Sequence, residues 1–95
     1  MKESKFSLGE VAWTRGIAIK AEEDLEFRNF ISSSLKRHRA GDWGEIDKED
    51  WKENEFSLDK YLRLFSAYKN SQHPKIWIIT EADRSVTTIL FPNEY

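Results

Sequence analysis

Two short segments of the chain gather residue types that could bind or react with a partner. In the first, Gly-Asp-Trp-Gly, a carboxylate (Asp42) and an indole (Trp43) lie between two glycines. Glycine allows backbone conformations and close approaches that other residues resist, so the segment could present Asp42 and Trp43 to another surface. The alternative interpretation is that the glycines end a helix and that Trp43 packs onto the core.

The second segment, residues 81–85, reads Glu-Ala-Asp-Arg-Ser and lies between two predicted strands. A planar guanidinium binds phosphates and carboxylates through paired hydrogen bonds, so Arg84 could hold an anionic group. Alternatively, the Asp and Ser only stabilise the turn, while Arg84 pairs with Glu81 or with the acidic helix before it. The sequence-based candidate binding residues are therefore Asp42, Trp43, Glu81, Asp83 and Arg84.

The remaining polar clusters indicate neither a metal site nor a catalytic centre. Residues 36–39, Lys-Arg-His-Arg, could contact nucleic-acid phosphates, but cations also favour the C-terminal end of a helix, and the acidic stretch 42–55 follows. The two histidines, His38 and His73, lack the spacing of a zinc motif, and there is no Cys. No nucleophile elbow, phosphate loop or dinucleotide fingerprint is present. We therefore expect no catalytic residue, no metal and no cofactor.

Helices are expected to precede strands in this chain. Residues 6–16 fit either a short strand or the capped start of a helix, and the pattern does not choose between them. A first helix is expected over 17–24, with Thr14 as a candidate N-cap. A longer helix is expected over 25–39, because its apolar residues recur at three- and four-residue steps and Gly41 can end it.

The start of a further helix carries the strongest local capping pattern. Asp47 is a candidate N-cap, and Asp50 holds the position of a capping-box acid. Ile46 and Trp51 occupy the two positions of a hydrophobic staple. Acidic residues early in a helix also favour the positive end of its dipole. We therefore expect a helix to begin directly after Asp47.

The C-terminal third has the composition of strands. Residues 61–68, 75–80 and 85–91 are rich in β-branched and aromatic side chains and are separated by short turn-forming segments. Three strands with such short links form an antiparallel meander. The middle strand is apolar on both faces over 76–79, which indicates a covered central strand or a face used for dimerisation. The expected fold class is α+β, with two or three N-terminal helices packed on a C-terminal three-stranded antiparallel β-meander.

The bulk composition is that of one small folded domain. The 95 residues fit one domain, and 39% hydrophobic residues, with four Trp and six Phe, exclude a disordered chain. Without Cys there are no disulfides, which is compatible with a reducing compartment. The net charge of −2 gives no overall attraction to nucleic acid. No stretch reaches the about 18 apolar residues of a membrane span, and residues 1–10 lack the apolar run of a secretory signal, so a cytoplasmic location is expected.

Three segments resemble a family of small bacterial proteins of unknown function. They are GDWGEIDKEDWKEN (41–54), LFSAY (64–68) and IWIITEADRSVTTILFPNEY (76–95). Members of that family occur on chromosomes, plasmids and phages and are often described as plasmid-related proteins. Residues 15–40 are more divergent, and Arg15 stands where the family has proline. The resemblance implies a one-domain bacterial protein, associated in some cases with mobile elements, and implies no catalytic residue.

The apolar central strand and the lack of a catalytic pattern favour a non-enzymatic protein-binding or regulatory module. Its partner would be another protein or a second copy of the chain. One alternative is a structural homodimer, paired through strand edges or through the face that carries Trp77. The other is an RNA-acting protein, because helices followed by an antiparallel meander resemble bacterial ribosome-dependent mRNA-cleaving toxins, which begin with a strand. For that activity the candidate cations are Arg63, Lys69, His73, Lys75 and Arg84. The negative net charge makes nucleic acid the less expected partner.

Overall fold

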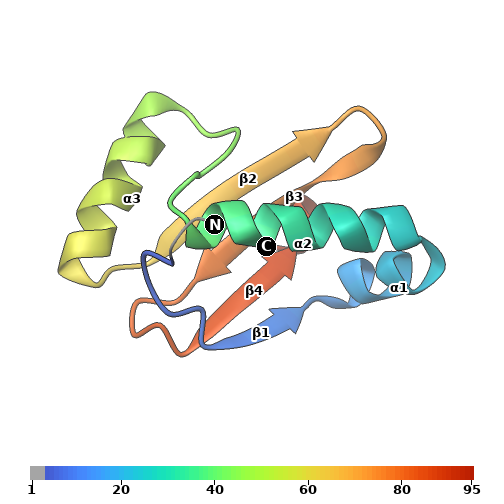
Figure 1. Ribbon diagram of the computed structural model, residues 1–95, viewed down its shortest axis with the longest axis horizontal. Helices are drawn as coiled ribbons and strands as arrows, with labels where there is room; N and C mark the ends of the chain where they lie inside the picture. The colour runs from blue at the N-terminus through green and yellow to red at the C-terminus, as the bar shows by residue number, and fades with distance from the viewer. Residues whose placement is uncertain (1–3) are drawn as a thin grey trace.

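The computed structural model describes residues 4–95, which fold as an α+β domain with three α-helices and one four-stranded sheet (Figure 1). In chain order the elements are β1 (Glu10–Trp13), α1 (Arg15–Glu23), α2 (Leu25–Arg39), α3 (Lys48–Lys60), β2 (Leu64–Asn70), β3 (His73–Thr80), β4 (Val86–Leu90) and a 3₁₀ turn, η1 (Pro92–Glu94). None of the helices in this part of the chain is long and apolar enough to cross a membrane.

The sheet is mixed, with the strand order β1-β4-β3-β2. Strands β2, β3 and β4 form the expected antiparallel meander. The prediction of three antiparallel strands is incomplete, however, because residues 10–13 add a fourth strand that runs parallel to β4, from Glu10 opposite Val86 to Trp13 opposite Ile89. A parallel pair requires a long crossover, and here the three helices and strands β2 and β3 lie between the two partners in the chain. A segment of four residues is too short for alternation to distinguish it from a helix start.

Local capping sets the helix boundaries. The Asp24 carboxylate accepts a hydrogen bond from Phe27 N at 3.1 Å and begins α2. The Asp47 carboxylate accepts one from Asp50 N at 2.8 Å, which confirms the predicted start of α3. At its other end α3 stops at Tyr61, whose φ of 55° lies in the left-handed region. The predicted strand 61–68 therefore begins only at residue 64.

Helix α1 is capped differently from the prediction. Thr14 holds the N-cap position, but its side chain makes no capping hydrogen bond. Its hydroxyl instead donates to the Glu94 carboxylate at 2.5 Å, and Gly16 N donates to the same carboxylate at 2.8 Å. The C-terminal turn η1 thus supplies the acceptor at the start of α1. This long-range cap joins the two ends of the described chain.

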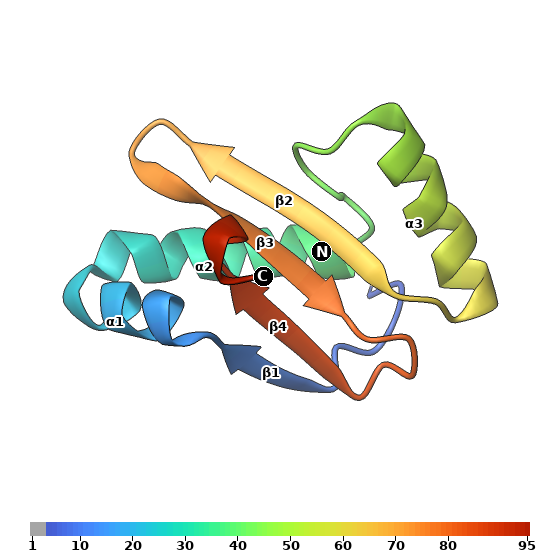
Figure 2. The same ribbon diagram turned by 180° about the vertical axis from the view of Figure 1, so that it is seen from behind.

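The helices do not all pack on one face of the sheet. Helices α1 and α2 cover one face, whereas α3 lies beyond the β2 edge (Figures 1 and 2). The side chains that α3 buries are Asn54 and Ser57, both polar, so this helix lacks the apolar stripe needed to cover a sheet. The expectation that two or three helices cover the sheet is therefore met by two.

The main core lies between the α1/α2 layer and the sheet. Its buried members are Ile17, Ala21, Phe27, Phe30, Ile31, Tyr68, Ile76, Ile78 and Ile89. On the opposite face no α-helix covers the sheet within the described residues, and the short η1 turn lies over β3 there (Figure 2). There the half-buried Trp77 packs edge-on against Phe65 and Tyr95, with ring centroids 5.1 and 5.7 Å apart. The two apolar faces of β3 therefore have different neighbours.

Candidate functional site

The Gly-Asp-Trp-Gly segment makes contacts within the fold. Gly41 has a φ of 85° and follows the last turn of α2. The Asp42 carboxylate accepts hydrogen bonds from the Arg37 guanidinium at 2.7 and 3.2 Å. Trp43 is fully buried, so its indole is part of the interior.

Arg84 binds main-chain oxygens within the chain. Its φ of 62° places it in the left-handed region of the turn between β3 and β4. Its guanidinium donates to Leu62 O at 2.6 Å and to Ser57 O at 2.9 Å, and more weakly to the carbonyls of Glu81 and Ala82 at 3.2 Å each. Burial lowers the pKa of this guanidinium. Arg84 therefore pairs with Glu81 and with α3, the partners of the alternative interpretation, but it does so through main-chain carbonyls and caps the C-terminal end of α3.

The two carboxylates of the same turn point to other partners. Asp83 accepts hydrogen bonds from the Ser85 hydroxyl at 2.6 Å and from Ser85 N at 3.0 Å, and these bonds lower the pKa of Asp83. Glu81 lies 3.7 Å from the Arg63 guanidinium in a half-exposed ion pair. Such pairs contribute little to stability. Each carboxylate thus serves its own turn or strand end.

Of the five sequence-based candidates, Trp43 and Arg84 share one neighbour, and Arg84 also bonds the main chain of Glu81. The shared neighbour is the Phe6 ring, which stacks on Trp43 at 6.1 Å and lies 5.7 Å from the Arg84 guanidinium carbon. Both side chains are buried, so neither faces a partner. The carboxylates of Asp42, Glu81 and Asp83 lie apart from this contact. The five residues therefore do not make up one surface site.

A buried polar chain runs from α2 across the sheet. His38 Nδ1 lies 2.5 Å from Ser66 Oγ, and His38 Nε2 lies 2.9 Å from Thr80 Oγ1. Thr80 Oγ1 lies 2.7 Å from Thr87 Oγ1, which donates to Leu8 O at 2.7 Å. Burial, aided by the nearby Arg84 charge, lowers the pKa of His38 to about 3, so the ring is neutral.

A base beside a serine hydroxyl is the arrangement of a nucleophilic centre. Here, however, His38 and Ser66 are both fully buried, so no substrate reaches them. The role of His38 was missed in the sequence, where it belonged to the basic run 36–39. Its spacing from Ile31 and Ser34 on the buried side of α2 was the available signal, because three- and four-residue steps continue the apolar stripe to this position.

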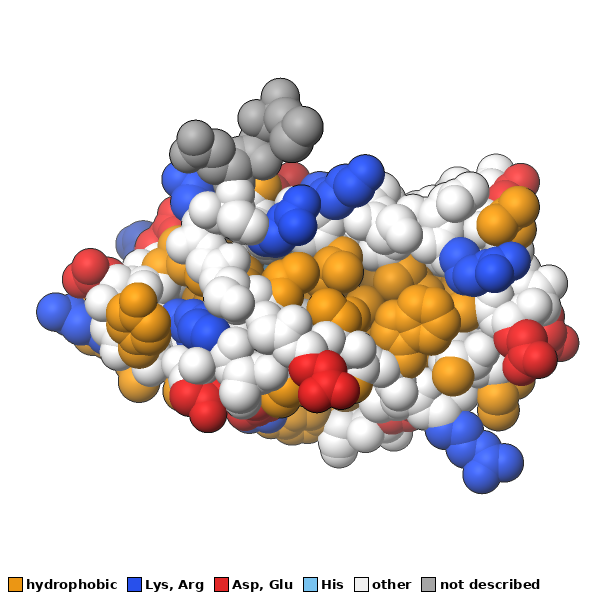
Figure 3. Space-filling model, turned by 60° about the horizontal axis from the view of Figure 1, so that its bottom comes forward, with side chains coloured by type: hydrophobic (Ala, Val, Ile, Leu, Met, Phe, Trp, Pro, Cys, Tyr) orange, Lys and Arg blue, Asp and Glu red, His pale blue; other side chains and the backbone are white. Residues whose placement is uncertain are grey.

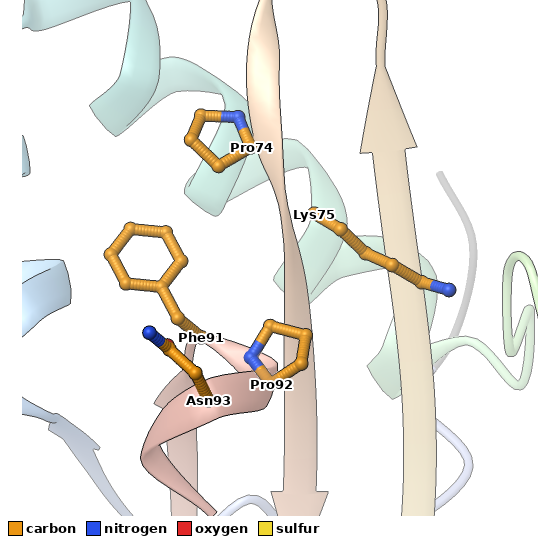
Figure 4. Close-up of a pocket in the computed structure, with 5 residues that line it drawn as sticks. All are labelled: Pro74, Lys75, Phe91, Pro92 and Asn93. Carbon is orange, nitrogen blue, oxygen red and sulfur yellow. The ribbon is translucent and has the colours of Figure 1, made fainter.

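A shallow hollow of about 410 Å³ lies between the start of β3 and η1. Its lining residues are Pro74, Lys75, Phe91, Pro92 and Asn93 (Figure 4). Small-molecule sites combine apolar walls with polar groups that converge on the ligand. In Figure 4 the Lys75 ammonium points away from the other four residues, so the polar groups of this hollow do not converge.

A second hollow, of about 210 Å³, lies on the sheet face opposite the helices. It is lined by Arg63, Phe65, Trp77, Ile79 and Tyr95. Arg63 donates to the Tyr95 hydroxyl at 2.9 Å and lies over its ring. The C-terminal residue therefore partly covers Trp77, the residue named in the homodimer hypothesis.

The cations of the RNA hypothesis do not form one cluster. Arg84 is bound to carbonyl oxygens, and the His73 ring stacks on Phe30 at 5.4 Å within the helix-covered side. Arg63 and Lys75 line different hollows. Lys69 is exposed at the end of β2. A strand at the start of the chain, which that hypothesis required, is present as β1.

The two outer edges of the sheet differ. At the β2 edge, the Asn54 side chain bonds both main-chain groups of Phe65, accepting from its N–H at 3.0 Å and donating to its carbonyl at 2.5 Å. The main chain of residues 43–45 pairs with Ala67, the next residue of β2 whose main-chain groups point away from β3. Ala67 N donates to Trp43 O at 3.2 Å, and Glu45 N donates to Ala67 O at 2.6 Å. The β2 edge is therefore covered at Phe65 and Ala67.

The β1 edge is open. Glu10 N donates to Ser85 O at 2.9 Å and Thr14 N to Ile89 O at 3.1 Å. Alternate residues of a parallel strand bond the same neighbour, so the main-chain groups of Val11 and Trp13 point away from β4. Within residues 4–95, no side chain or loop bonds these outward groups.

The side chains of Val11 and Trp13 are also exposed, at 41% and 44%. Opposite them in β4 stand Thr87 and Ile89, which are buried on the helix-covered side. Val11 and Trp13 therefore lie on that side of the sheet. Figure 3 shows apolar side chains gathered in the middle of this surface, with Lys and Arg side chains along its upper border.

A groove of about 190 Å³ lies between α2 and Leu8, two residues before β1. Its lining residues are Leu8, Ser32, Leu35, Lys36 and Arg39. We define the β1 site as the open edge of β1 with its side chains Val11 and Trp13, together with this groove. The site escaped the sequence-based reasoning because it exists only once a short strand pairs at the sheet border and leaves its other side free.

Within residues 4–95, no three or more His, Cys, Asp or Glu side chains are grouped so that they could hold a metal ion. Comparison of the chain with protein-family models, curated proteins and solved structures finds no match in any of the three.

Proposed function

We propose that the protein is a non-enzymatic protein-binding module that accepts an extended segment of another protein along β1. The observation that carries this proposal is the contrast between the two sheet edges. Asn54 and residues 43–45 occupy outward groups of β2, whereas those of Val11 and Trp13 have no partner in the described chain. An open edge with exposed apolar side chains is a template for an added strand.

The chemistry of strand addition fits this edge. Main-chain hydrogen bonds to Val11 and Trp13 would supply affinity, and the side chains of the added segment would supply specificity. Proteins commonly protect an exposed edge with charges, proline or a covering element. Here the two outward-facing positions carry Val11 and Trp13. The resemblance to a small bacterial family stays a prediction, and no residue role is taken from it.

Other functions have less support from the geometry. The serine and histidine that could form a nucleophilic pair are buried, and the polar groups of the hollow beside η1 diverge. The RNA alternative requires a strand before the helices, and β1 is such a strand. Its candidate cations, however, lie in different parts of the surface and interior. These arrangements favour binding of a protein over catalysis.

The test uses a substitution that removes an outward donor. Proline is tolerated on an edge strand where the lost N–H faces solvent, so Val11→Pro should remove one bond to an added strand and keep the pairing with β4. Val11→Thr is the matched control, because threonine keeps the N–H and the strand propensity. Circular dichroism and thermal unfolding establish that both variants fold.

Binding is measured by selecting a phage-displayed library of random peptides on the wild-type protein and titrating the selected peptides into each variant. Wild type and Val11→Thr are expected to bind, and Val11→Pro is expected to lose binding. If Val11→Pro does not fold, Trp13→Lys, which places a charge on the edge, replaces it. Selected peptides that bind both edge variants as tightly as wild type would show that β1 is not the binding surface.

A further inference from the structure

The β1 site has a chemical asymmetry that specifies the segment it accepts. A strand added to β1 points alternate side chains to the helix-covered side, where the groove beside α2 lies. The groove is lined by two apolar residues, Leu8 and Leu35, and by two cations, Lys36 and Arg39. An incoming segment therefore meets apolar surface and positive charge together.

The two cations are free to act on a partner. In the described part of the chain no ion pair or side-chain hydrogen bond is found for Lys36 or Arg39, and both are exposed. Arg37, which lies between them in sequence, is instead bound to Asp42. Arg28 lies one turn before Ser32 on the same side of α2 and adds a third cation to this border.

The border carries no compensating acid from β1. The one acidic residue of the strand is Glu10, which pairs with Val86. Successive side chains of a strand alternate between the two faces, so Glu10 lies on the face opposite to that of Val11 and Trp13. Opposite charge across an interface favours the correct partner and disfavours others. A carboxylate of the added segment would therefore be attracted to the end of the groove at Lys36 and Arg39.

A second copy of the chain fits the site less well. Antiparallel pairing of two β1 strands would be symmetric, with the same surface used on both sides. With Ala12 on the twofold axis, Val11 would lie opposite Trp13 of the other copy. The same symmetry would bring the two cationic α2 borders together, and like charges oppose that contact.

We infer that the β1 site recognises an extended peptide segment in which an apolar side chain enters the groove between Leu8 and α2 and acidic side chains bind Lys36 and Arg39. This inference rests on the proposed function, since it names the chemistry of the partner at the same edge. The apolar side chain gives burial in a small groove, and the carboxylates give charge-assisted hydrogen bonds to the two cations.

The experiment compares peptides and charge variants. Peptides selected from the random library on wild-type protein are expected to be enriched in Asp or Glu beside an apolar residue. The double variant Lys36→Glu, Arg39→Glu should weaken their binding about tenfold or more. The matched control is Lys48→Glu, Lys52→Glu, which makes the same charge change on exposed positions of α3 and should leave binding unchanged. Titrations follow Trp fluorescence at low and high salt.

A second control separates strand addition from binding of any polyanion. The selected peptide is remade with proline at alternate positions, which keeps its charge and removes its ability to pair as a strand. This peptide is expected not to bind. Equal binding of the proline peptide, or of a single-stranded RNA oligonucleotide, would replace the inferred partner by a general polyanion and overturn the inference.

The remaining outcomes are also decisive. If the selected peptides are neutral or basic, the inferred chemistry is wrong and the proposed function stands. The same holds if the peptides fail to bind Val11→Pro but bind the Lys36→Glu, Arg39→Glu variant as tightly as wild type. If no peptide is selected, or if Val11→Pro binds normally, both fail. If light scattering gives twice the mass of one chain, 11.3 kDa, and Val11→Pro restores the single mass, the occupant is a second copy and the inference is overturned.

Discussion

At the scale of single residues, the side chains that could have formed a binding site are used to hold main-chain groups of the same chain. Arg84 binds four carbonyl oxygens, and Asp47 and Asp24 each accept a main-chain N–H at a helix start. Charged side chains form strong hydrogen bonds to backbone groups, and unpaired helix-end groups need such partners. A charged residue in a turn is therefore as consistent with capping as with ligand binding.

Replacing Asp47 by alanine should lower the free energy of unfolding by about 1 kcal/mol, because the N–H of Asp50 loses its acceptor. Urea unfolding followed by circular dichroism measures this loss. Glu55→Ala, at an exposed position in the middle of α3, is the control and should change stability little. Equal stability of Asp47→Ala and wild type would contradict the assignment of this cap.

Replacing Arg84 by lysine should cost about 1–3 kcal/mol, because a single ammonium cannot reach carbonyls from three segments as the planar guanidinium does. Arg63→Lys should cost less, because Arg63 is exposed and donates to the Tyr95 hydroxyl at 2.9 Å. Urea midpoints of the two variants make the comparison. Similar midpoints would show that the carbonyl contacts of Arg84 add nothing to stability.

At the scale of elements, the cover of the β2 edge depends on a short segment that approaches the strand closely. Gly44 has a φ of 76° and pairs with Ala67 across the edge. A Cβ at this position would collide with the Ala67 carbonyl and the Tyr68 ring. The glycine is therefore required for the main chain to cover the edge.

Gly44→Ala should destabilise the protein by more than about 1 kcal/mol, because strain from the positive φ adds to the collision. Gly41→Ala has a similar φ of 85° but meets only the flexible Lys5 side chain, so its loss should be smaller. Thermal unfolding of both variants gives the order. A reversed order would mean that the close approach of Gly44 to β2 does not limit stability.

At the scale of the whole molecule, the buried polar chain from His38 to Leu8 joins α2, three of the four strands and the segment before β1. Buried polar groups are costly unless their hydrogen bonds are made, and here both ring nitrogens of His38 have hydroxyl partners. The chain therefore favours one arrangement of the helix over the sheet. It also makes the fold sensitive to the charge of a single ring.

Stability should decrease as the pH falls below about 6.5. Burial lowers the pKa of His38 from 6.5 to about 3, so between these values the unfolded chain binds a proton that the folded chain does not. The free energy of unfolding then falls with decreasing pH, at most by about 1.4 kcal/mol per pH unit for this group. Urea unfolding from pH 7 down to about 5, above the range of most carboxylates, measures the slope.

Glutamine does not titrate, so His38→Gln should lose this pH dependence of the free energy of unfolding. The variant should also be less stable than wild type at pH 7, because glutamine does not reproduce both ring contacts. A slope in His38→Gln equal to that of wild type would assign the pH dependence to other groups.

The sequence by itself determined the features that depend on neighbouring residues. Caps at Asp47 and the stop at Gly41 act within a few positions, and the meander follows from links too short for any other connection. The exact boundaries of the elements differ from the prediction where the backbone takes a less common conformation. Tyr61, for example, is left-handed and ends α3, so β2 begins at Leu64 and not at residue 61. Such local rules carried the α+β class and most of the helices.

Tertiary structure decided what each of these elements meets. The pairing of β1 with β4, the hydroxyl partners of His38 and the carbonyl partners of Arg84 join residues far apart in sequence, 79 positions in the contact of Thr87 with Leu8. No local pattern reports which edge of a sheet is covered. The β1 site exists because Asn54 and Gly44 cover part of one edge while the other has no such cover, and only the assembled sheet determines that difference.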